Sequence, residues 1–284
     1  MQTGTGFPAP AKLNLFLHVI GRRPDGYHML QSVFTLIDRC DEVRLRVRDD
    51  GQVRRTAELP GVPESEDLAV RAALLLKEAS GSPKGVDIEI EKRIPLGAGL
   101  GGGSSDAATV LLALDRLWET GFGADALAEL GAALGADVPF FIHGSSAWVE
   151  GVGERITPIE LPCLWYLVLT PPVAVPTGVV FAAPELTRNT EPLKMEDFSA
   201  QPLESVGPRF RNDLEPVVTA RYPIVREHLE WLRRHADARM TGSGSCVFAS
   251  FATREEAQSV LDRLPAPMQG FVAQGIGHHP LRAQ

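Results

Sequence analysis

The chain has 284 residues, of which 44% are hydrophobic and 23% are charged, and its formal net charge is −8. This length and composition are typical of a globular protein with two domains, or with two lobes that share a cleft. The negative charge argues against a nucleic-acid partner, which would need a basic surface to release counterions from the phosphates.

The apolar runs and the cysteines favour a cytoplasmic protein. The run Leu13–Ile20 is short, and the run Leu161–Val175 is interrupted by prolines. Neither reaches the roughly 20 apolar residues that a membrane helix needs. The three cysteines are widely spaced and form no CxxC pair. We therefore expect neither a disulfide framework nor a zinc site.

The first half of the chain is predicted to contain both strands and helices. Leu13–Ile20 and Glu42–Arg48 are predicted strands, the second because apolar and basic residues alternate along it. Ser65 is expected to begin a helix that holds Asp67 in its first turn and stops at Gly81. Further predicted elements are the strand Val86–Glu91, helices near 104–118 and 124–134, and short strands at Ala147–Val149 and Arg155–Thr157.

A proline-punctuated stretch, 158–176, is the predicted boundary between a lobe of residues 1–158 and a lobe of residues 159–284. The second lobe is predicted to hold the strands Leu164–Leu169, Cys246–Phe251 and Phe271–Gln274 and the helices Ile224–Arg234 and 253–264. Thr253 and Glu256 form a capping box at the start of the last helix. Because strands and helices do not alternate strictly, the predicted fold class is α+β with mixed sheets.

The strongest local pattern is PLGAGLGGGSSD at Pro95–Asp106, where five of the seven residues from Gly97 to Gly103 are glycine. Without Cβ atoms, successive backbone N–H groups can line one concavity. The helix that follows adds its positive N-terminal end, so this turn is a predicted phosphate site. The residues expected to hold the phosphates are Pro95, Leu96, Gly97, Ala98, Gly99, Leu100, Gly101, Gly102, Gly103, Ser104 and Ser105. The two serines also offer hydroxyl groups to a metal ion.

The glycine-rich turn alone does not decide the class of protein. It lacks the lysine of a Walker A loop, and the chain lacks the HRD and DFG elements of protein kinases. Residues 92–95 separate the turn from its strand, unlike a Rossmann turn. A dinucleotide-binding oxidoreductase, with Asp125 as its acidic residue, and a non-catalytic anion-binding module stay open. A flexible linker is disfavoured because the turn lies between an amphipathic strand and an apolar helix.

Two further motifs flank this turn. Lys12 and Asn14 lie two residues apart on a predicted strand and therefore share a face. Thr241–Phe248 is a second turn of small residues that leads into a strand. Taken alone, an exposed strand face is the preferred explanation of Lys12 and Asn14, and a hairpin or crossover turn is a fair explanation of Thr241–Phe248.

In identity, order and spacing, the three motifs resemble those of the GHMP kinases, which include galactokinases and the kinases of homoserine, mevalonate and phosphomevalonate. Four further segments resemble the 4-diphosphocytidyl-2-C-methyl-D-erythritol kinases within that superfamily: Arg23–His28, Gly135–Phe140, Val175–Phe181 and Arg211–Glu215. The resemblance covers nearly the whole chain. It implies a two-lobed α+β fold with mixed sheets and an active-site cleft between the lobes.

The resemblance also implies an activity. ATP, with Mg²⁺, would donate its γ-phosphoryl group to the 2-hydroxyl of a cytidine-diphosphate substrate in the non-mevalonate route to isoprenoid precursors. Asp137 matches the catalytic aspartate of the family and would act as the base. Lys12 matches the catalytic lysine, which would keep that carboxylate ionised and polarise the hydroxyl. Without the resemblance, a helix-terminal or turn residue before Pro139 would be the preferred explanation of Asp137.

Four residues match substrate contacts of the family: Asn14, Tyr27, His28 and Phe181. The two aromatic rings of Tyr27 and Phe181 are expected to sandwich the cytosine, while His28 bonds the base edge and Asn14 the methylerythritol hydroxyls. Core packing is the alternative for Phe181, and a loop position is the alternative for His28.

Two residues match positions near the nucleotide. Lys92 is one. Asp67 is the other, at a position where the family usually has an asparagine that contacts adenine. An ionised aspartate only accepts hydrogen bonds, so this contact stays open beside a role as a first-turn acid.

The nearest alternative is another GHMP kinase, of the homoserine or mevalonate type. Tyr27, His28 and Phe181 favour the cytidine substrate over these alcohols. We expect a monomer or weak homodimer with a small-molecule partner, and no nucleic-acid or membrane partner.

Overall fold

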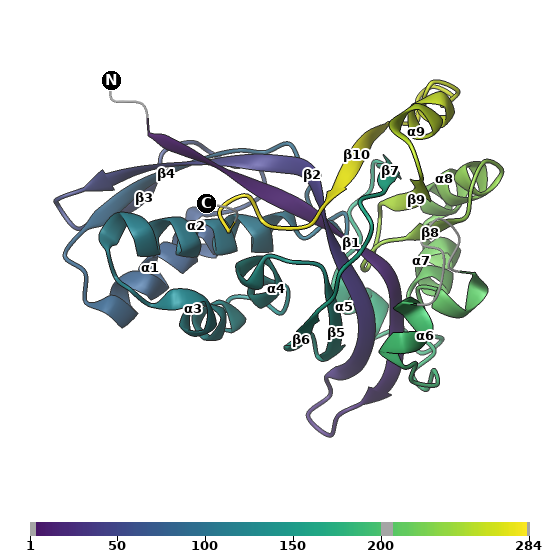
Figure 1. The fold of residues 1–284 in the computed structure, drawn as a ribbon, viewed down its shortest axis with the longest axis horizontal. Coiled ribbons are helices and arrows are strands. Elements are labelled where there is room, and N and C mark those ends of the chain that lie inside the picture. The colour runs from purple at the N-terminus through teal and green to yellow at the C-terminus, as the bar shows by residue number, and fades with distance from the viewer. Residues whose placement is uncertain (1–3, 200–206, 283–284) are drawn as a thin grey trace.

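The structure is a computed structural model, and it describes residues 4–199 and 207–282. Its central feature is an antiparallel ribbon of two long strands, β1 (Thr5–Arg22) and β2 (His28–Arg48). The ribbon runs from one side of the molecule to the other (Figure 1). Residues 9–19 of β1 are all buried, because protein covers both faces of the strand there. Three register shifts interrupt the pairing, and such bulges increase the local twist.

The remaining strands are β3 (Val53–Arg55), β4 (Gly85–Glu91), β5 (Ala147–Gly151), β6 (Arg155–Pro158), β7 (Trp165–Leu169), β8 (Ala238–Met240), β9 (Val247–Phe251) and β10 (Gly270–Ile276). The α-helices are α1 (Leu68–Ser80), α2 (Gly102–Trp118), α3 (Gly123–Ala132), α4 (Val138–His143), α5 (Thr177–Phe181), α6 (Met195–Ser199), α7 (Glu215–Arg221), α8 (Pro223–Arg233) and α9 (Arg254–Leu261). Single 3-10 turns lie at Glu64–Glu66 and Pro208–Phe210.

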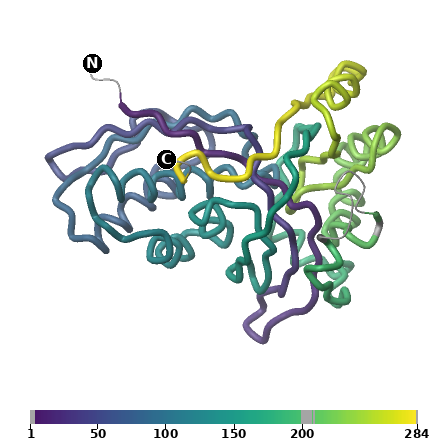
Figure 2. Tube along the Cα trace, in the orientation of Figure 1, coloured from purple at the N-terminus to yellow at the C-terminus, as the bar shows by residue number. Residues whose placement is uncertain are grey.

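The strands form one sheet in the order β3-β4-β2-β10-β7-β9-β8, with β1 and β5 also paired to β2, and β6 paired to β5. The β3–β4 pair is parallel, whereas the other strand pairs are antiparallel. The strand β10 returns to the middle of the sheet and joins β2 to β7, as the yellow end of the trace shows (Figure 2). The predicted α+β class with a mixed sheet is confirmed.

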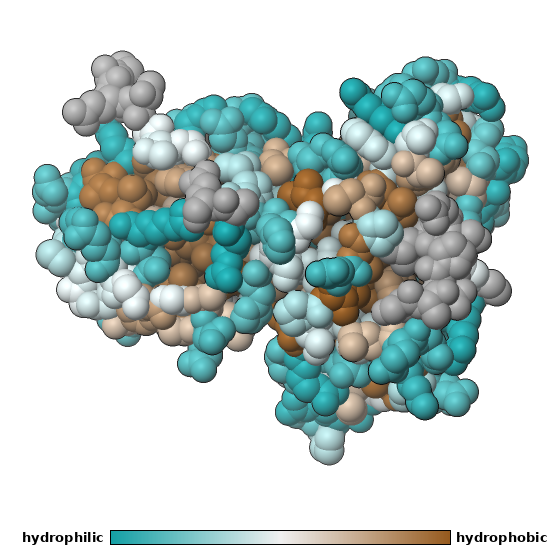
Figure 3. Space-filling view, in the orientation of Figure 1, coloured by the Kyte–Doolittle hydropathy of each residue, from teal (hydrophilic) through white to brown (hydrophobic). Residues whose placement is uncertain are grey.

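Two groups of helices pack on the sheet. The helices α1 and α2 pack on the first-half strands, and α3 and α4 pack on these helices; their shared core includes the largely buried helix α2. The helices α8 and α9 contact β7 to β10 on the other side of the molecule, and α7 packs against α8 (Figure 1). Patches of apolar surface lie over the middle of the molecule between hydrophilic margins (Figure 3). Within the described residues, no helix is both long enough and apolar enough to cross a bilayer.

Most predicted elements are present, but two helix starts differ. The prediction that Asp67 lies in a first helical turn is wrong, because α1 begins at Leu68 and Asp67 is its N-cap, accepting a 2.9 Å hydrogen bond from the Ala69 N–H. The helix α2 begins at Gly102, two residues before the predicted start. Gly81 ends α1 as predicted, in a left-handed conformation, and the capping box of α9 is also confirmed.

Candidate functional site

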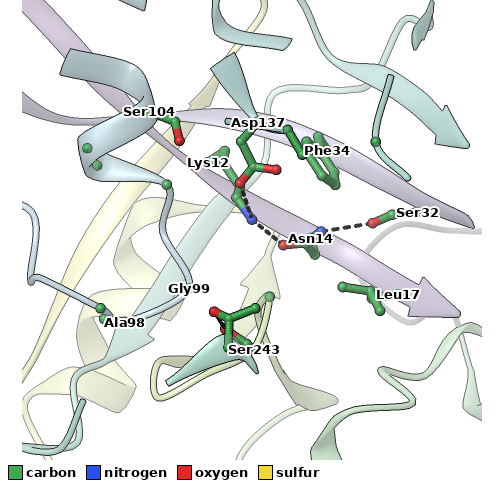
Figure 4. A pocket seen from close by; sticks show the side chains of 18 of the residues that line it. Lys12, Asn14, Leu17, Ser32, Phe34, Ala98, Gly99, Ser104, Asp137 and Ser243 are labelled. Carbon is green, nitrogen blue, oxygen red and sulfur yellow. Dashed lines mark hydrogen bonds and ion pairs between the residues drawn. The ribbon is translucent and has the colours of Figure 1, made fainter. Parts of the chain in front are cut away.

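A cavity of about 430 Å³ collects residues from both halves of the sequence. Its walls come from β1 and β2, from the glycine-rich turn before α2, from the start of α4, and from α5 and the turn that holds Gly242 and Ser243. Figure 4 shows several of these side chains around the open space. The arrangement agrees with the cleft that the resemblance implied.

The glycine-rich turn forms one wall of this cavity. Every residue from Pro95 to Ser104 except Leu100 lines it. Gly99 has a φ of 79°, and a Cβ atom there would lie 2.3 Å from the carbonyl oxygen of Thr241. Glycine is therefore required at this position both by its conformation and by the close approach of another backbone segment.

Leu100 and Ser105 connect the turn to β1 instead of facing the cavity. The carbonyl of Leu100 accepts a 3.0 Å hydrogen bond from the Lys12 N–H. The buried hydroxyl of Ser105 donates to the Pro10 carbonyl at 2.6 Å. These contacts hold the turn against the strand that carries Lys12.

The helix α2 starts at the cavity wall. Gly102, Gly103 and Ser104 form its first turn, and all three line the cavity. Their backbone N–H groups have no partner within the helix, and the N-cap residue Gly101 has no side chain to cover them. No acidic residue lies in this first turn. The helix end is therefore suited to bind an anion.

Lys12 and Asp137 lie next to each other in the cavity, beside the glycine-rich turn (Figure 4). The Lys12 ammonium is 3.5 Å from a carboxylate oxygen of Asp137 and donates to Asn14 Oδ1 at 2.5 Å. It also lies 4.8 Å from the ring centre of Phe34, a favourable cation–π distance. The lysine side chain is 4% exposed and that of Asp137 is 31% exposed. The expected proximity of Lys12 to Asp137, and the shared face of Lys12 and Asn14, are confirmed.

Asn14 links this pair to the third motif. Its backbone N–H donates to the Thr241 hydroxyl at 3.0 Å, and its side-chain amide donates to the Ser32 hydroxyl at the same distance. Gly242 and Ser243, which follow Thr241, line the cavity. The three motifs therefore meet at one place.

Lys92 lies at the edge of the cavity between two carboxylates. Its ammonium bonds the fully buried Asp41 and lies 2.6 Å from Asp106 Oδ2. Asp41 also accepts the backbone N–H groups of Arg93 and Ile94. Burial alone would lower the pKa of Lys92, but the two carboxylates outweigh it and raise that pKa.

Asp106 is the less satisfied of the two carboxylates. Its Oδ1 atom is buried without a hydrogen-bond partner among the described residues. Burial raises the pKa of Asp106 to about 7, with the negative charge of Asp41 adding to this effect and Lys92 opposing it. One lysine compensates one carboxylate, and the second is left to take up a proton near neutral pH.

Asp67 is buried away from the cavity lining. One carboxylate oxygen caps α1, and the other pairs with Arg55 at 2.9 Å. Leu68, the next residue, does line the cavity. The adenine contact of Asp67 stays a prediction.

Three residues are expected to contact the nucleobase, namely Phe181, His28 and Tyr27, and of these Phe181 lines the cavity. The ring centre of Phe181 is 5.0 Å from that of His28 at an interplanar angle of 32°. Tyr27, in the turn between β1 and β2, is 65% exposed. Burial, and the charges of Arg188 and Arg22, lower the pKa of His28. His28 and Tyr27 are not among the residues that line the cavity.

Sequence reasoning missed several polar residues of the site. Thr177 and Ser243 both line the cavity, with their hydroxyl oxygens 2.7 Å apart. Arg188 donates to His28. The buried amide of Asn212 donates to the carbonyls of Met240 and Gly242 at 2.8 Å and so holds the third motif. Thr177, Ser243 and Asn212 belong to segments that the resemblance had marked, whereas Arg188 lies outside all of them.

Comparison with known proteins identifies the family. Residues 67–145 match the N-terminal domain of GHMP kinases, and residues 195–270 match the C-terminal domain of GHMP kinases. A 4-diphosphocytidyl-2-C-methyl-D-erythritol kinase of Thiobacillus denitrificans is 62% identical over 97% of this chain and 96% of that protein. The protein of the same name from Nitrosospira multiformis is 57% identical over 99% of this chain and 94% of its own length.

Solved structures agree with these relatives. A crystal structure of 4-(cytidine 5'-diphospho)-2C-methyl-D-erythritol kinase has a TM-score of 0.83 and 37% identity, covering 96% of this chain and all of that one. The mevalonate kinase of Methanococcus jannaschii has a TM-score of 0.71 over 97% of this chain and 99% of its own, at only 14% identity, and so shares the fold. A dinucleotide-binding oxidoreductase is therefore excluded. The chain belongs to the 4-diphosphocytidyl-2-C-methyl-D-erythritol kinase family of the GHMP kinases.

Proposed function

We propose that this protein transfers the γ-phosphoryl group of ATP to the 2-hydroxyl of 4-diphosphocytidyl-2-C-methyl-D-erythritol, giving the 2-phosphate and ADP. The reaction belongs to non-mevalonate isoprenoid precursor biosynthesis. The observation that carries the proposal is the Lys12–Asp137 pair, which shares one cavity with the glycine-rich turn in a chain 62% identical to a kinase of this name.

The glycine-rich turn and the start of α2 bind the phosphates of ATP. The N–H groups of residues 102–104 have no helical partner, and the residues around them carry no side chains that would block a phosphate. Phosphoryl transfer depends chiefly on positioning and on neutralising charge, and both are supplied by fixed backbone donors. Lys92 is held at the edge of the same wall by its two carboxylates.

Asp137 receives the proton of the attacking hydroxyl. Its side chain makes no capping bond at the start of α4 and is one-third exposed, so an oxygen is available to a substrate. The Lys12 ammonium has three protons. It directs donors to Asn14 and Asp137, which leaves one for a phosphate oxygen or the attacking hydroxyl. Lys12 therefore holds Asp137 in place and compensates negative charge during transfer.

The cytidine end lies against Phe181 and His28, with Tyr27 closing over it from the exposed turn. Phe181 lines the cavity, its ring contacts that of His28, and the exposed Tyr27 precedes His28 in the chain. Two such aromatic rings suit a flat base, which stacks between them. A homoserine or mevalonate kinase has no base to place there. This aromatic group therefore favours the cytidine substrate over those of the alternative GHMP kinases.

We propose that Mg²⁺ enters with the nucleotide. Among residues 4–199 and 207–282, no group of three or more His, Cys, Asp or Glu side chains is arranged to hold a metal ion. Mg²⁺ commonly needs only one or two protein oxygens, because waters and substrate phosphates complete its shell. The Ser104 hydroxyl, which lines the cavity, fits that requirement. The bound ion would neutralise charge on the phosphates.

The remaining expectations are proposed with the function. The enzyme would act in the cytoplasm as a monomer or weak homodimer, without a nucleic-acid partner. The net charge of −8 and the three unpaired cysteines support this setting.

The test is ATP turnover by the purified protein with 4-diphosphocytidyl-2-C-methyl-D-erythritol, mevalonate and homoserine as separate acceptors. We expect ADP and a 2-phosphate product with the first acceptor only. Turnover with mevalonate or homoserine, and none with the cytidyl acceptor, would show that the protein has the activity of another GHMP kinase. If none of the three acceptors is phosphorylated, the proposed acceptor chemistry is refuted.

A further inference from the structure

Arg188 forms a hydrogen bond with the His28 ring, although no sequence motif had marked this arginine. Its Nε donates to His28 Nε2 at 3.0 Å. Its terminal nitrogens donate to the carbonyls of Leu186, Phe181 and Ala183 at distances between 2.6 and 3.0 Å. The guanidinium is thus fixed by three backbone carbonyls at and after the end of α5, and its Nε–H is aimed at one ring nitrogen.

This contact determines which nitrogen of His28 carries the proton. A guanidinium only donates hydrogen bonds, so Nε2 of His28 must accept and the ring proton must lie on Nδ1. A second proton would place an N–H group against the Arg188 donor. The ring is also half-buried, and the cations that face it are Arg188 and Arg22. His28 is therefore a neutral ring whose Nδ1–H is a donor with no partner among the described residues.

The protonation of His28 matters because cytosine and uracil differ in whether their N3 atom accepts or donates a hydrogen bond. Cytosine presents a bare N3, which accepts a hydrogen bond, whereas uracil carries a proton on N3 and donates. An Nδ1–H donor matches the first and opposes the second. A ring free to exchange tautomers would present a donor to cytosine or an acceptor to uracil.

We propose that Arg188 is a positioning residue that locks His28 in its Nδ1–H form and thereby makes the site select cytosine over uracil. The inference rests on the proposed function, because it places the base beside His28 and Phe181. Arg188 acts through His28 and does not touch the base. A site built to hydrogen-bond one pattern rejects the opposite pattern strongly, since a buried donor is left facing another donor.

The tautomer can be measured without substrate. The chain has seven histidines, and nitrogen-15 NMR of the imidazole rings distinguishes protonated from bare ring nitrogens. His28→Gln identifies the signals of His28 by their loss. We expect Nδ1–H in the wild type, a shift toward the Nε2–H form in Arg188→Met, and recovery of Nδ1–H in Arg188→Lys, which restores a donor. A wild-type ring protonated on Nε2 would overturn the proposal.

The selectivity is measured as the ratio of kcat/KM for the cytidyl substrate to that for its uridyl counterpart. We expect Arg188→Met to lower this ratio about 10-fold or more. Arg221→Met is the matched control, because Arg221 also bonds a carbonyl of α5, that of Val179, and pairs with Glu185 without contacting His28. The control should keep the wild-type ratio.

The ratio separates this role from a merely structural one. If Arg188 only supported the segment around Phe181, its loss would weaken both substrates equally and leave the ratio unchanged, which would overturn the proposal. Failure of the wild type to use the cytidyl substrate would refute the proposed function instead, while the NMR measurement would still report on the link between Arg188 and His28.

Discussion

Replacing Asp106 with asparagine should reduce the stability that the folded protein loses as the pH rises from about 4 to about 8. The carboxyl group is buried in the first turns of α2, and burial raises its pKa to about 7 despite Lys92. Between the pKa of an unfolded aspartate, about 4, and this higher value, the folded protein keeps a proton that the unfolded chain has lost. The folded state therefore binds more protons, and its stability falls as the pH rises through this window.

The size of the effect follows from the same shift. Raising the pKa of a carboxyl group from about 4 to about 7 corresponds to a loss of up to about 4 kcal/mol of folding free energy on going from pH 4 to pH 8. Asparagine keeps the shape of the side chain and an oxygen for Lys92, but it does not ionise. The advantage of Asp106→Asn over the wild type should thus grow with pH toward this value.

The assay is equilibrium urea unfolding of both proteins from pH 4 to pH 8. A matched control is Asp87→Asn, which removes another buried carboxylate. At Asp87, burial is outweighed by hydrogen bonds from Arg46 and Arg48, which lower the pKa. Its contribution is present above the unfolded pKa and is lost as the pH falls, so this variant should lose stability most at neutral pH. Parallel curves for Asp106→Asn and the wild type would refute the reasoning.

Three further substitutions test the site. Asp137→Asn should lower kcat by about 10²–10⁴-fold while calorimetry still detects ATP binding; near-normal turnover would remove this carboxylate from the chemistry. Gly99→Ala should cost about 1–3 kcal/mol in urea unfolding, because its Cβ would lie 2.3 Å from the Thr241 carbonyl at a φ of 79°, whereas Gly277→Ala, with nothing within 4 Å, should be neutral. Tyr27→Ala should raise KM for the cytidyl substrate and leave kcat nearly unchanged; an unaltered KM would count against stacking by this exposed ring.

Short-range physics explains which elements were predictable. The strands at 86–91 and 164–169, the end of α1 at Gly81 and the capping box of α9 depend on neighbouring residues, and each was predicted closely. The full length of β1 and β2 was not, because prolines and charged residues interrupt their apolar pattern while the surrounding protein still buries them. The six-residue helix α4 is too short to show a period.

The site required information from farther apart in the chain. Lys12 and Asp137 are separated by 125 positions, and their proximity was predicted only from the family resemblance. Arg188 and His28 are 160 residues apart, and neither spacing nor composition indicates their contact. The pairing of Asp67 with Arg55 likewise depends on the position of the short strand β3. Tertiary packing determines these contacts, and no local pattern encodes them.

The backbone of the glycine-rich turn explains why the three motifs are informative only together. The Leu100 carbonyl accepts from the first motif at Lys12, and the Ala98 carbonyl accepts from the third motif at Cys246, at 3.0 and 3.1 Å. The Thr241 hydroxyl, 3.3 Å from the Gly99 carbonyl, lies between these two bonds. A glycine-rich segment would lose much conformational entropy on ordering, and these bonds offset that loss before any nucleotide arrives. The turn is therefore a phosphate site of fixed shape only because β1 and the turn before β9 hold it, and a change in any one motif should disturb the geometry of the other two.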